Sequence, residues 1–284
     1  MRRERVAFQG ERGAFSEVAI RQLLGTRAEA IPCQRFDQVF AALRDKKASA
    51  AVIPIENTLH GSVHENYDHL LNFKFEICGE TSVRISHSLI APPGMTFRKV
   101  KRVFSHPVAL NQCLNFFAKH PHIEKVPFYD TAGSVKMIME ERPEGGAAIA
   151  SSVAAEIYGA KILKRSLEDD RRNYTRFFLL RRPEDAARTK RPAGKCKTSI
   201  VFSTRNVPGG LFRALGAFAL RDVNLAKIES RPLRGKPWEY LFYVDLNGSQ
   251  DQENVQKALG HLAELADFLR VLGCYPEDRA QRRS

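Results

Sequence analysis

Short apolar runs alternate with segments of helical periodicity through residues 1–182, and this alternation limits the fold to the α/β class. The run "RVAFQG" precedes "AFSEVAIRQLL", "KRVFSHP" precedes "VALNQCLNFFAKH", and "GAAIASSVAAEIYG" joins both kinds of segment. Such alternation predicts βαβ units and an open sheet. Open α/β sheets bind their ligands at the carboxyl ends of the strands. Polar residues that follow the strands are therefore the first candidates for a site.

A second pattern follows a segment rich in proline, glycine and charge. Residues 183–196 lack a hydrophobic period and are predicted to link two domains. Residues 197–276 then run in the order strand, helix, strand, strand, helix, strand, which is typical of a ferredoxin-like βαββαβ domain. Residues 277–284 are expected to form a tail.

The composition narrows the class of partner. The chain carries 45 Lys and Arg against 32 Asp and Glu, a net charge of +13 that favours anions. It has no basic block with interleaved aromatic residues, so a small anionic substrate fits better than nucleic acid. No run approaches the roughly 18 apolar residues of a membrane helix, and "MRRERVAFQG" is too polar for a signal peptide, so a cytoplasmic protein without membrane contact is expected. Five widely spaced cysteines predict reduced thiols.

In "VIPIENTLHGSV", an apolar strand runs into Glu56 and Asn57. Asn57 could bind a ligand there, although an asparagine that only closes a turn explains this motif equally well. Glu56, His60 and His64 have the spacing of metal ligands on a helix, but Gly61 disfavours that helix. We therefore predict no metal site.

Two further turns combine free amides with hydroxyl groups. In "FQGERGAFSEVA", Gly10, Gly13 and Ser16 could face an anion or form only a capped βα turn, and the spacing is not that of a dinucleotide-binding loop. In "FSHPVALNQC", no nucleophile elbow surrounds Ser105 and His106. Ser105 is expected to cap the helix that follows.

The segments "DTAG" and "NYTRFFLL" place polar residues at the start of an element. Asp130 or Thr131 is expected to cap a helix whose first amides could receive a carboxylate, with plain capping as the simpler explanation. Thr175 and Arg176 stand at the entrance to an apolar strand, so one could face a cleft while the other braces it, or both could face it if the strand entry twists. Taken alone, the pair is more simply a surface salt-bridge cluster.

Taken together and in order, these segments, with "ESRP" near the end, resemble the prephenate dehydratase family in its form with a C-terminal ACT domain. The resemblance implies that residues 1–182 form a catalytic domain of two lobes, like a type II periplasmic binding protein, with the active site in the cleft between them. It implies a lyase that converts prephenate to phenylpyruvate, carbon dioxide and water in phenylalanine biosynthesis. It also implies that residues 197–276 form an ACT regulatory domain.

The resemblance implies catalytic and substrate-binding roles for particular residues. Thr175 would donate a hydrogen bond to the departing hydroxyl, and Arg176 would bind the side-chain carboxylate of the substrate if it faces the cleft. Asn57 and Gln112 complete the implied catalytic set, and no cofactor or metal is implied. The implied substrate-binding residues are Glu56, Ser105, His106, Thr131, Ala132, Gly133 and Phe177.

Two departures from the family pattern leave the substrate open. Val108 replaces a frequent glutamine, and "DTAG" replaces the commoner "TAA". The "DTAG" form and "SVHENYDHLL" are similar to the arogenate dehydratases of plants, whose substrate carries an ammonium group. Arogenate is therefore the alternative substrate.

The ACT resemblance implies phenylalanine as the effector and a homodimer or homotetramer. Phe212 replaces a smaller residue and is expected to narrow the effector pocket. The implied effector-binding residues are Gly209, Gly210, Leu211, Glu229, Ser230, Arg231 and Pro232.

Two other classes of protein compete with an enzyme. A non-catalytic metabolite sensor could use the same two-lobed scaffold. A transcriptional regulator would carry a helix-turn-helix segment ahead of the effector lobe, but here the first strand is expected by residue 5.

Overall fold

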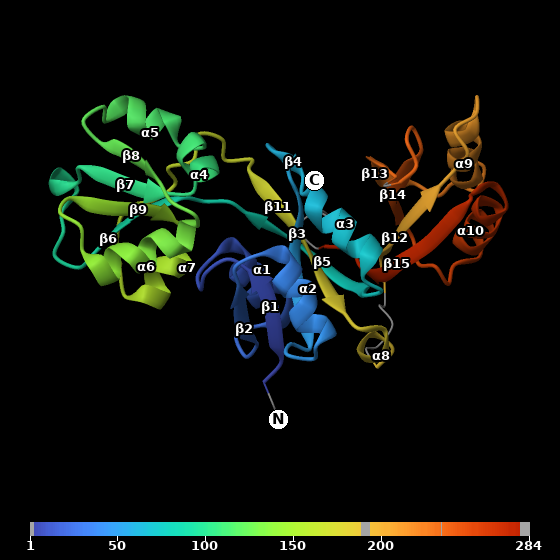
Figure 1. Cartoon of the computed structure of the whole chain (residues 1–284), viewed down its shortest axis with the longest axis horizontal. Helices are drawn as coiled ribbons and strands as arrows, with labels where there is room; N and C mark the ends of the chain where they lie inside the picture. Colours follow the sequence, from blue (N-terminus) through green and yellow to red (C-terminus); the bar gives the residue numbers. More distant parts are fainter. Residues whose placement is uncertain (1–2, 189–193, 234, 279–284) are drawn as a thin grey trace. The chain divides into compact units, whose positions relative to one another are not determined.

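The computed structural model describes residues 3–188, 194–233 and 235–278 (Figure 1). The chain divides into two compact units. The first contains Met1–Phe73 and Thr81–Leu179, and the second contains Lys74–Glu80 and Leu180–Ser284. None of the helices in the described ranges is long and apolar enough to cross a membrane.

The first lobe of the first unit is built on a mixed sheet in the order β2-β1-β3-β11-β5, as the sequence predicts for an α/β fold. Strand β1 pairs in parallel with both β2 and β3, and the short strand β4 pairs antiparallel with the end of β3. The strands are β1 (Arg5–Gln9), β2 (Glu29–Cys33), β3 (Ala50–Asn57), β4 (Gly61–Ser62), β5 (Glu76–Arg84) and β11 (Tyr174–Arg181). The helices are α1 (Phe15–Leu24), α2 (Phe36–Arg44) and α3 (His64–Asn72).

The second lobe has a five-stranded sheet in the order β10-β6-β9-β7-β8, in which β7 pairs in parallel with β8 and β9. Its strands are β6 (Ser88–Ala91), β7 (Arg102–Ser105), β8 (Glu124–Pro127), β9 (Gly146–Ala150) and β10 (Lys161–Lys164). Its helices are η1 (Phe97–Lys99), α4 (Pro107–Asn111), α5 (Leu114–Lys119), α6 (Thr131–Glu141) and α7 (Ser152–Tyr158).

The segment "VALNQCLNFFAKH" forms two helices, whereas its periodicity predicts one. Helix α4 ends at Asn111 with Gln112 as its C-cap, and α5 begins after Cys113. The carboxylate of Asp169 accepts hydrogen bonds from the backbone N–H groups of Leu114 and Asn115, at 2.7 and 3.0 Å. A carboxylate that satisfies the free amides of a helix start is a cap. Asp169 lies in a loop far away in the sequence. Its contact with the start of α5 stabilises the break between the two helices and thereby fixes where Gln112 lies.

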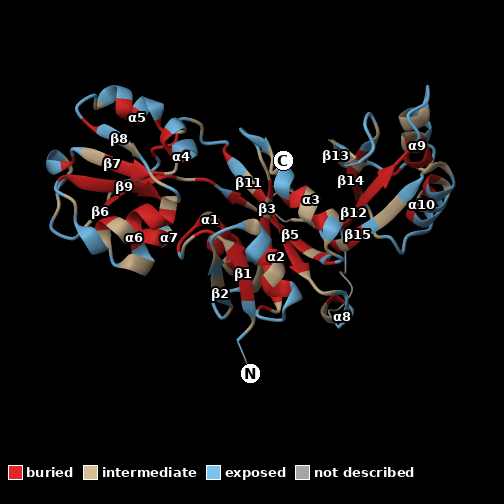
Figure 2. Cartoon of the chain, in the orientation of Figure 1, coloured by how far each residue is buried: buried red, intermediate tan, exposed pale blue. Residues whose placement is uncertain are grey.

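A shared apolar core joins the two lobes. Val6, Phe8 and Phe177 of the first lobe belong to the same buried cluster as Ala148 and Ala150 of the second. Figure 2 shows this burial along the central strands of both sheets. Because apolar area removed from water is the main favourable term in folding, the lobes are stabilised as one unit.

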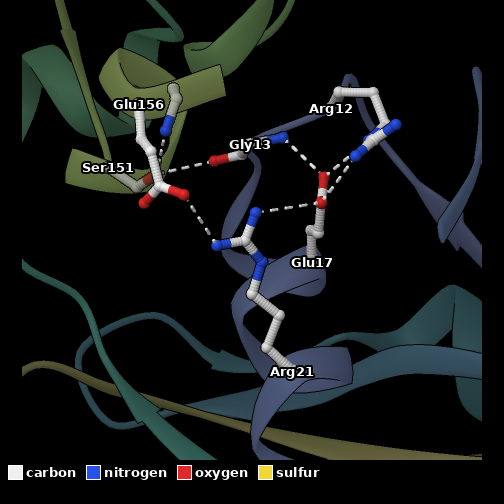
Figure 3. Close-up of polar contacts among 7 residues, drawn as sticks. Arg12, Gly13, Glu17, Arg21, Ser151 and Glu156 are labelled. Carbon is white, nitrogen blue, oxygen red and sulfur yellow. Dashed lines mark hydrogen bonds and ion pairs between the residues drawn. The ribbon is translucent and has the colours of Figure 1, made fainter. Parts of the chain in front are cut away.

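Polar contacts also join the lobes, at the turn between β1 and α1 (Figure 3). The hydroxyl of Ser151, which caps α7, donates to the carbonyl oxygen of Gly13 at 2.6 Å. Arg21 of α1 lies 3.5 Å from Glu17 and 3.6 Å from Glu156 of α7. Burial disfavours the charged form of Glu17, but hydrogen bonds from Arg12 and Gly13 outweigh it and lower its pKa.

The second unit has the predicted βαββαβ order. Its antiparallel sheet runs β13-β14-β12-β15, and its core includes Phe202, Phe218 and Ala258. Leu220 lies just beyond the end of the first helix of this unit and is 79% exposed. The elements are β12 (Cys196–Ser203), α9 (Gly210–Ala219), β13 (Leu225–Pro232), β14 (Tyr240–Asn247), α10 (Glu253–Leu265) and β15 (Phe268–Pro276).

The segment Lys74–Glu80 belongs to the second unit although it precedes the predicted boundary by about a hundred residues. Glu80 forms a 2.9 Å ion pair with Lys197, and both side chains are buried. Periodicity carries no signal of such a long-range pair. The predicted linker begins with a short helix, α8 (Pro183–Ala186), and its residues 189–193 lie outside the described part, as do residues 279–284 of the predicted tail.

Candidate active site

A cleft of about 370 Å³ lies between the two lobes of the first unit. This volume is within the range of small-molecule sites, roughly 300–1,000 Å³. Among the described residues that line it, none is lysine or arginine, and Asp130 is the single carboxylate. Its polar lining consists of Gln9, Ser16, Asn57, His60, His87, His106, Gln112, Tyr129, Asp130, Thr131 and Thr175. The polar groups of the cleft are therefore mostly uncharged hydrogen-bonding groups, namely hydroxyls, amides and imidazoles.

The Thr175 hydroxyl is held at the cleft by Asn57. The Asn57 Nδ2 group donates to Thr175 Oγ1 at 2.9 Å, and also lies 2.7 Å from Asn173 Oδ1. Asn57 Oδ1 accepts from the backbone N–H groups of Leu59 and His60, both at 3.0 Å, which fixes the amide orientation. Because Thr175 Oγ1 accepts from Asn57, its own hydrogen remains to be donated into the cleft. Asn57 therefore positions a hydroxyl as well as closing a turn.

Arg176 lies on the other side of β11 and does not line the cleft. It is 5% exposed, with Nη1 3.2 Å from Glu56 Oε1 and its guanidinium 4.8 Å from the Phe178 ring centre. Neighbouring residues of a strand point to opposite faces, so Thr175 and Phe177 face the cleft while Arg176 does not. The condition for Arg176 to bind the substrate carboxylate is not met, and Glu56 is likewise absent from the lining. The pair instead braces the strand that carries Thr175.

Gln112, at the end of α4, connects two histidines across the cleft. Its Oε1 lies 2.8 Å from His87 Nε2, and its Nε2 lies 3.2 Å from His60 Nδ1. His60 Nδ1 is also 3.2 Å from Asn57 Oδ1. A chain of polar contacts thus runs from His87 in the strand connection through Gln112 and His60 to Asn57.

The start of α6 contributes Asp130 and Thr131 to the cleft. Asp130 is the helix cap, and its Oδ1 accepts from the N–H of Gly133 at 2.7 Å. Burial, followed by the nearby charge of Glu11, raises the pKa of Asp130. Ala132 and Gly133 are buried and absent from the lining, and the cap already occupies the Gly133 amide. Neither of these two residues, which the resemblance implies, therefore lines the cleft.

Ser105 does not reach the cleft and does not cap α4. Its fully buried hydroxyl donates to the carbonyl oxygen of Ile149 at 2.6 Å, which ties β7 to β9. The cap of α4 is His106, whose Nδ1 accepts from the N–H of Val108 at 3.2 Å. An acceptor Nδ1 leaves the proton on Nε2. His106 and Val108 both line the cleft.

The metal-ligand spacing of Glu56, His60 and His64 is not realised on a helix. Gly61 has φ +76° and α3 begins only at His64, so no continuous helix aligns the three side chains. The described residues contain no group of three or more potential metal ligands.

Sequence reasoning overlooked several residues of the cleft, chiefly His87, Phe15 and Tyr129. His87 follows β5 in "VRISHSLI", so it could have been found as a polar residue after a strand. Phe15 and Tyr129 are aromatic residues at helix starts, and nothing local distinguishes them from core residues. The ring of Phe15 packs edge-on to His87 at 5.7 Å.

A separate cavity of about 400 Å³ lies in the second unit. Gly209, Gly210 and Leu211 line it, as the ACT resemblance implies, and so does Phe212, which is 80% exposed. Gly209 has φ +75°, and a Cβ on Gly210 would lie 2.8 Å from the carbonyl oxygen of Arg205. The turn into α9 thus requires glycine at both positions.

The four implied effector residues of β13 do not line this cavity in a single chain. They lie one strand away from it. Ser230 is opposite Phe242 and Pro232 is opposite Tyr240, and both aromatic residues line the cavity. The β13 residues concerned are Glu229, Ser230, Arg231 and Pro232.

Comparison with known proteins supports the same division of the chain. A family model described as prephenate dehydratase matches residues 6–185, and one described as ACT domain matches residues 198–264. An Arabidopsis thaliana protein named arogenate dehydratase/prephenate dehydratase 2, chloroplastic, is 46% identical over 285 residues, which cover 97% of this chain and 74% of the relative. Arogenate dehydratase 2 of Petunia hybrida is 44% identical, with 97% and 72% covered.

Solved structures share the whole fold. A prephenate dehydratase from Arthrobacter aurescens in complex with L-Phe is 32% identical with a TM-score of 0.85, and covers 96% of this chain and 90% of its own. GqqA, described as a novel type of quorum quenching acylase, is 33% identical with a TM-score of 0.90, and covers 98% and 100%. One fold can host unrelated chemistry, so the activity must be argued from the site.

Proposed function

Because this chain belongs to the prephenate dehydratase family, with an ACT regulatory domain, we propose that it catalyses the decarboxylating dehydration of prephenate to phenylpyruvate, carbon dioxide and water. The observation that carries the proposal is the Thr175 hydroxyl, held by Asn57 with its hydrogen available to the cleft. A non-catalytic sensor could use the same donor to bind its ligand, so a turnover assay distinguishes the two classes.

The reaction breaks two bonds between the ring and its substituents and needs one proton. The bond between the ring and its carboxylate breaks and releases carbon dioxide. The electron pair of that bond forms the new double bond of the ring, and the bond to the hydroxyl on the opposite carbon breaks. Hydroxide is a poor leaving group, so a hydrogen bond or proton must reach the departing oxygen. Thr175 supplies that hydrogen bond, and the proton that completes the water comes ultimately from solvent.

The absence of lysine and arginine from the described lining suits this chemistry. A cation paired with the ring carboxylate would stabilise a charge that is lost in the transition state, and would slow the reaction. Neutral donors such as the Gln112 amide and His106 can orient the substrate without that cost. A poorly solvated carboxylate also favours release of neutral carbon dioxide.

Arogenate is the second candidate substrate, and Asp130 favours it. Arogenate carries an ammonium group where prephenate has a ketone, and Asp130 places the single carboxylate of the cleft lining among neutral groups. A partly buried carboxylate binds an ammonium group and repels a further anion. The plant relatives also favour arogenate as the substrate, since their names include arogenate dehydratase.

Replacement of Asp130 by asparagine tests this choice. Asparagine caps a helix about as well as aspartate, so folding should be unaffected. We expect the ratio of kcat/KM for arogenate to that for prephenate to fall about tenfold, which corresponds to about 1.4 kcal/mol of lost attraction. Steady-state rates of phenylalanine formation give kcat/KM for arogenate, and rates of phenylpyruvate formation give kcat/KM for prephenate. An unchanged ratio would show that Asp130 serves only as the cap, and turnover of neither substrate by the unmodified protein would favour the sensor alternative.

We also propose that phenylalanine binds the second unit and regulates the enzyme, and that the protein works in the cytoplasm as a homodimer or homotetramer. The ACT domain and the L-Phe complex of the Arthrobacter aurescens relative support the effector. The cavity beside Gly209 and Gly210 supports its place in this chain.

Replacement of Gly210 by alanine should weaken phenylalanine binding at least about tenfold, because the new Cβ would displace the Arg205 carbonyl that shapes the cavity. Titration calorimetry measures the affinity, and activity without effector should be unchanged. Gly216→Ala is the control, since Gly216 lies in the same helix and a Cβ there meets nothing within 4 Å. Equal affinity in both variants would place the effector elsewhere.

A further inference from the structure

His87 is a buried histidine whose two ring nitrogens have unlike surroundings. Its side chain lines the cleft, yet the residue is 1% exposed. Its backbone N–H donates to Glu168 Oε2 at 2.9 Å, and Glu168 is paired with Arg84. Nε2 lies 2.8 Å from Gln112 Oε1, whereas Nδ1 has no hydrogen-bond partner within the part of the chain that the structure describes.

These surroundings decide where the His87 proton lies. Burial lowers the pKa of His87, so the ring is neutral at neutral pH and carries a single N–H. A buried N–H without an acceptor costs roughly 1–3 kcal/mol. The proton is therefore on Nε2, which has a partner, and not on Nδ1. It follows that His87 donates and Gln112 Oε1 accepts.

The orientation of the Gln112 amide follows from that bond. With its oxygen turned to His87, the amide presents N–H groups on the opposite side, toward His60 Nδ1 and the cleft. Asn57 is oriented in the same sense, because its oxygen accepts two backbone N–H groups and its nitrogen faces Thr175. The Asn57 and Gln112 amides thus both offer hydrogen-bond donors, which is what an anionic ligand requires where lysine and arginine do not line the cleft.

We propose that His87 is a positioning residue that holds the Gln112 amide with its N–H groups toward the substrate. The role rests on the proposed function, since it concerns the binding of an anionic cyclohexadienol. His87 affects the substrate only indirectly, by orienting the Gln112 amide. A freely rotating Gln112 amide would present its carbonyl oxygen to the anion part of the time and would weaken both binding and orientation.

A double-mutant cycle on kcat/KM separates this role from a structural one. The variants are His87→Phe, which keeps a ring against Phe15 but removes the donor, Gln112→Leu, and the combination of the two. Removing one preorganised donor costs roughly 10²–10³ in rate, so we expect a loss of that order for Gln112→Leu and about tenfold or more for His87→Phe. The double variant should be no slower than Gln112→Leu, because His87 then has no amide to orient.

Two further variants distinguish a specific loss of activity from a general loss of folding. His87→Gln retains a side-chain donor and should recover much of the activity lost in His87→Phe. Gln112→Glu keeps the acceptor for His87 Nε2 but replaces the N–H donors with a negative charge, so kcat/KM should fall at least as far as in Gln112→Leu. Circular dichroism and thermal unfolding check that each variant is folded.

Several results would overturn the inference. Additive losses in the cycle, wild-type activity in His87→Phe, or wild-type activity in Gln112→Glu would each exclude the positioning role. An unmodified protein that turns over neither prephenate nor arogenate would overturn the proposed function and, with it, this role. An active unmodified protein with additive losses would overturn this role alone.

Discussion

Replacement of Thr175 by valine should reduce kcat/KM by roughly 10²–10⁴, the range for loss of a group that assists proton transfer in the transition state. Valine keeps the shape of threonine and removes only the hydroxyl. The fold should survive, because the Asn57 amide retains Asn173 Oδ1 and the Tyr174 carbonyl oxygen as acceptors. Steady-state kinetics with prephenate and arogenate measure the loss, and thermal unfolding measures the stability.

Thr175→Ser is the matched control for this experiment. Serine restores a hydroxyl that Asn57 can orient, so its activity should lie between those of valine and threonine. A valine variant within tenfold of the unmodified protein would show that another group assists the departing hydroxyl. Equal losses for serine and valine would indicate that the hydroxyl alone does not sustain the reaction and that the methyl group of Thr175 is also needed.

Replacement of Gly13 by alanine should destabilise the first unit by about 2–5 kcal/mol. Gly13 has φ +88°, which costs an L-residue about 1–2 kcal/mol. Its new Cβ would lie 2.6 Å from the Cα of Ala154, so α7 must move, and overpacking of this kind costs about 1–3 kcal/mol. The turn that shifts leads directly into Phe15 and Ser16 of the cleft, so kcat/KM should fall as well. Denaturant unfolding and steady-state kinetics measure the two effects.

Gly159→Ala separates backbone strain from steric conflict. Gly159 also has a left-handed backbone, with φ +65°, but a Cβ there meets nothing within 4 Å. We expect it to cost only the strain, about 1–2 kcal/mol, and to leave catalysis unchanged. If the two variants lose equal stability, the close approach of Gly13 to Ala154 adds no steric cost to the substitution.

The alternation of Thr175 and Arg176 shows how far local rules reach. Strand geometry places the two side chains on opposite faces, which allows one to face a cleft while the other braces it, and the structure has this arrangement. Local rules could not say which residue faces the cleft. That depends on Glu56, which is 120 positions away in the sequence and draws Arg176 to the far side of the sheet.

The break between α4 and α5 shows where local rules fail. Helical periodicity runs through Gln112 and Cys113, but Asp169, more than 50 positions later, caps a new helix there. The same loop determines where Gln112 lies, since the N–H of Asp169 donates to the Gln112 carbonyl oxygen at 2.8 Å. A residue whose position depends on a distant cap cannot be placed from its own neighbours.

The sequence by itself determined the α/β class of the first unit, the βαββαβ pattern of the second unit, and the strand ends and helix starts that carry polar residues. These follow from hydrophobic period and from turn and cap residues, which act over a few positions. The tertiary structure decided which of those residues meet. Asn57 contacts Thr175 across 118 positions, His87 contacts Gln112 across 25, and Ser105 and Gly133 turn away from the cleft into bonds of their own. Side-chain partners of this kind are chosen by packing, because a buried polar group must find its hydrogen bond wherever the fold provides one.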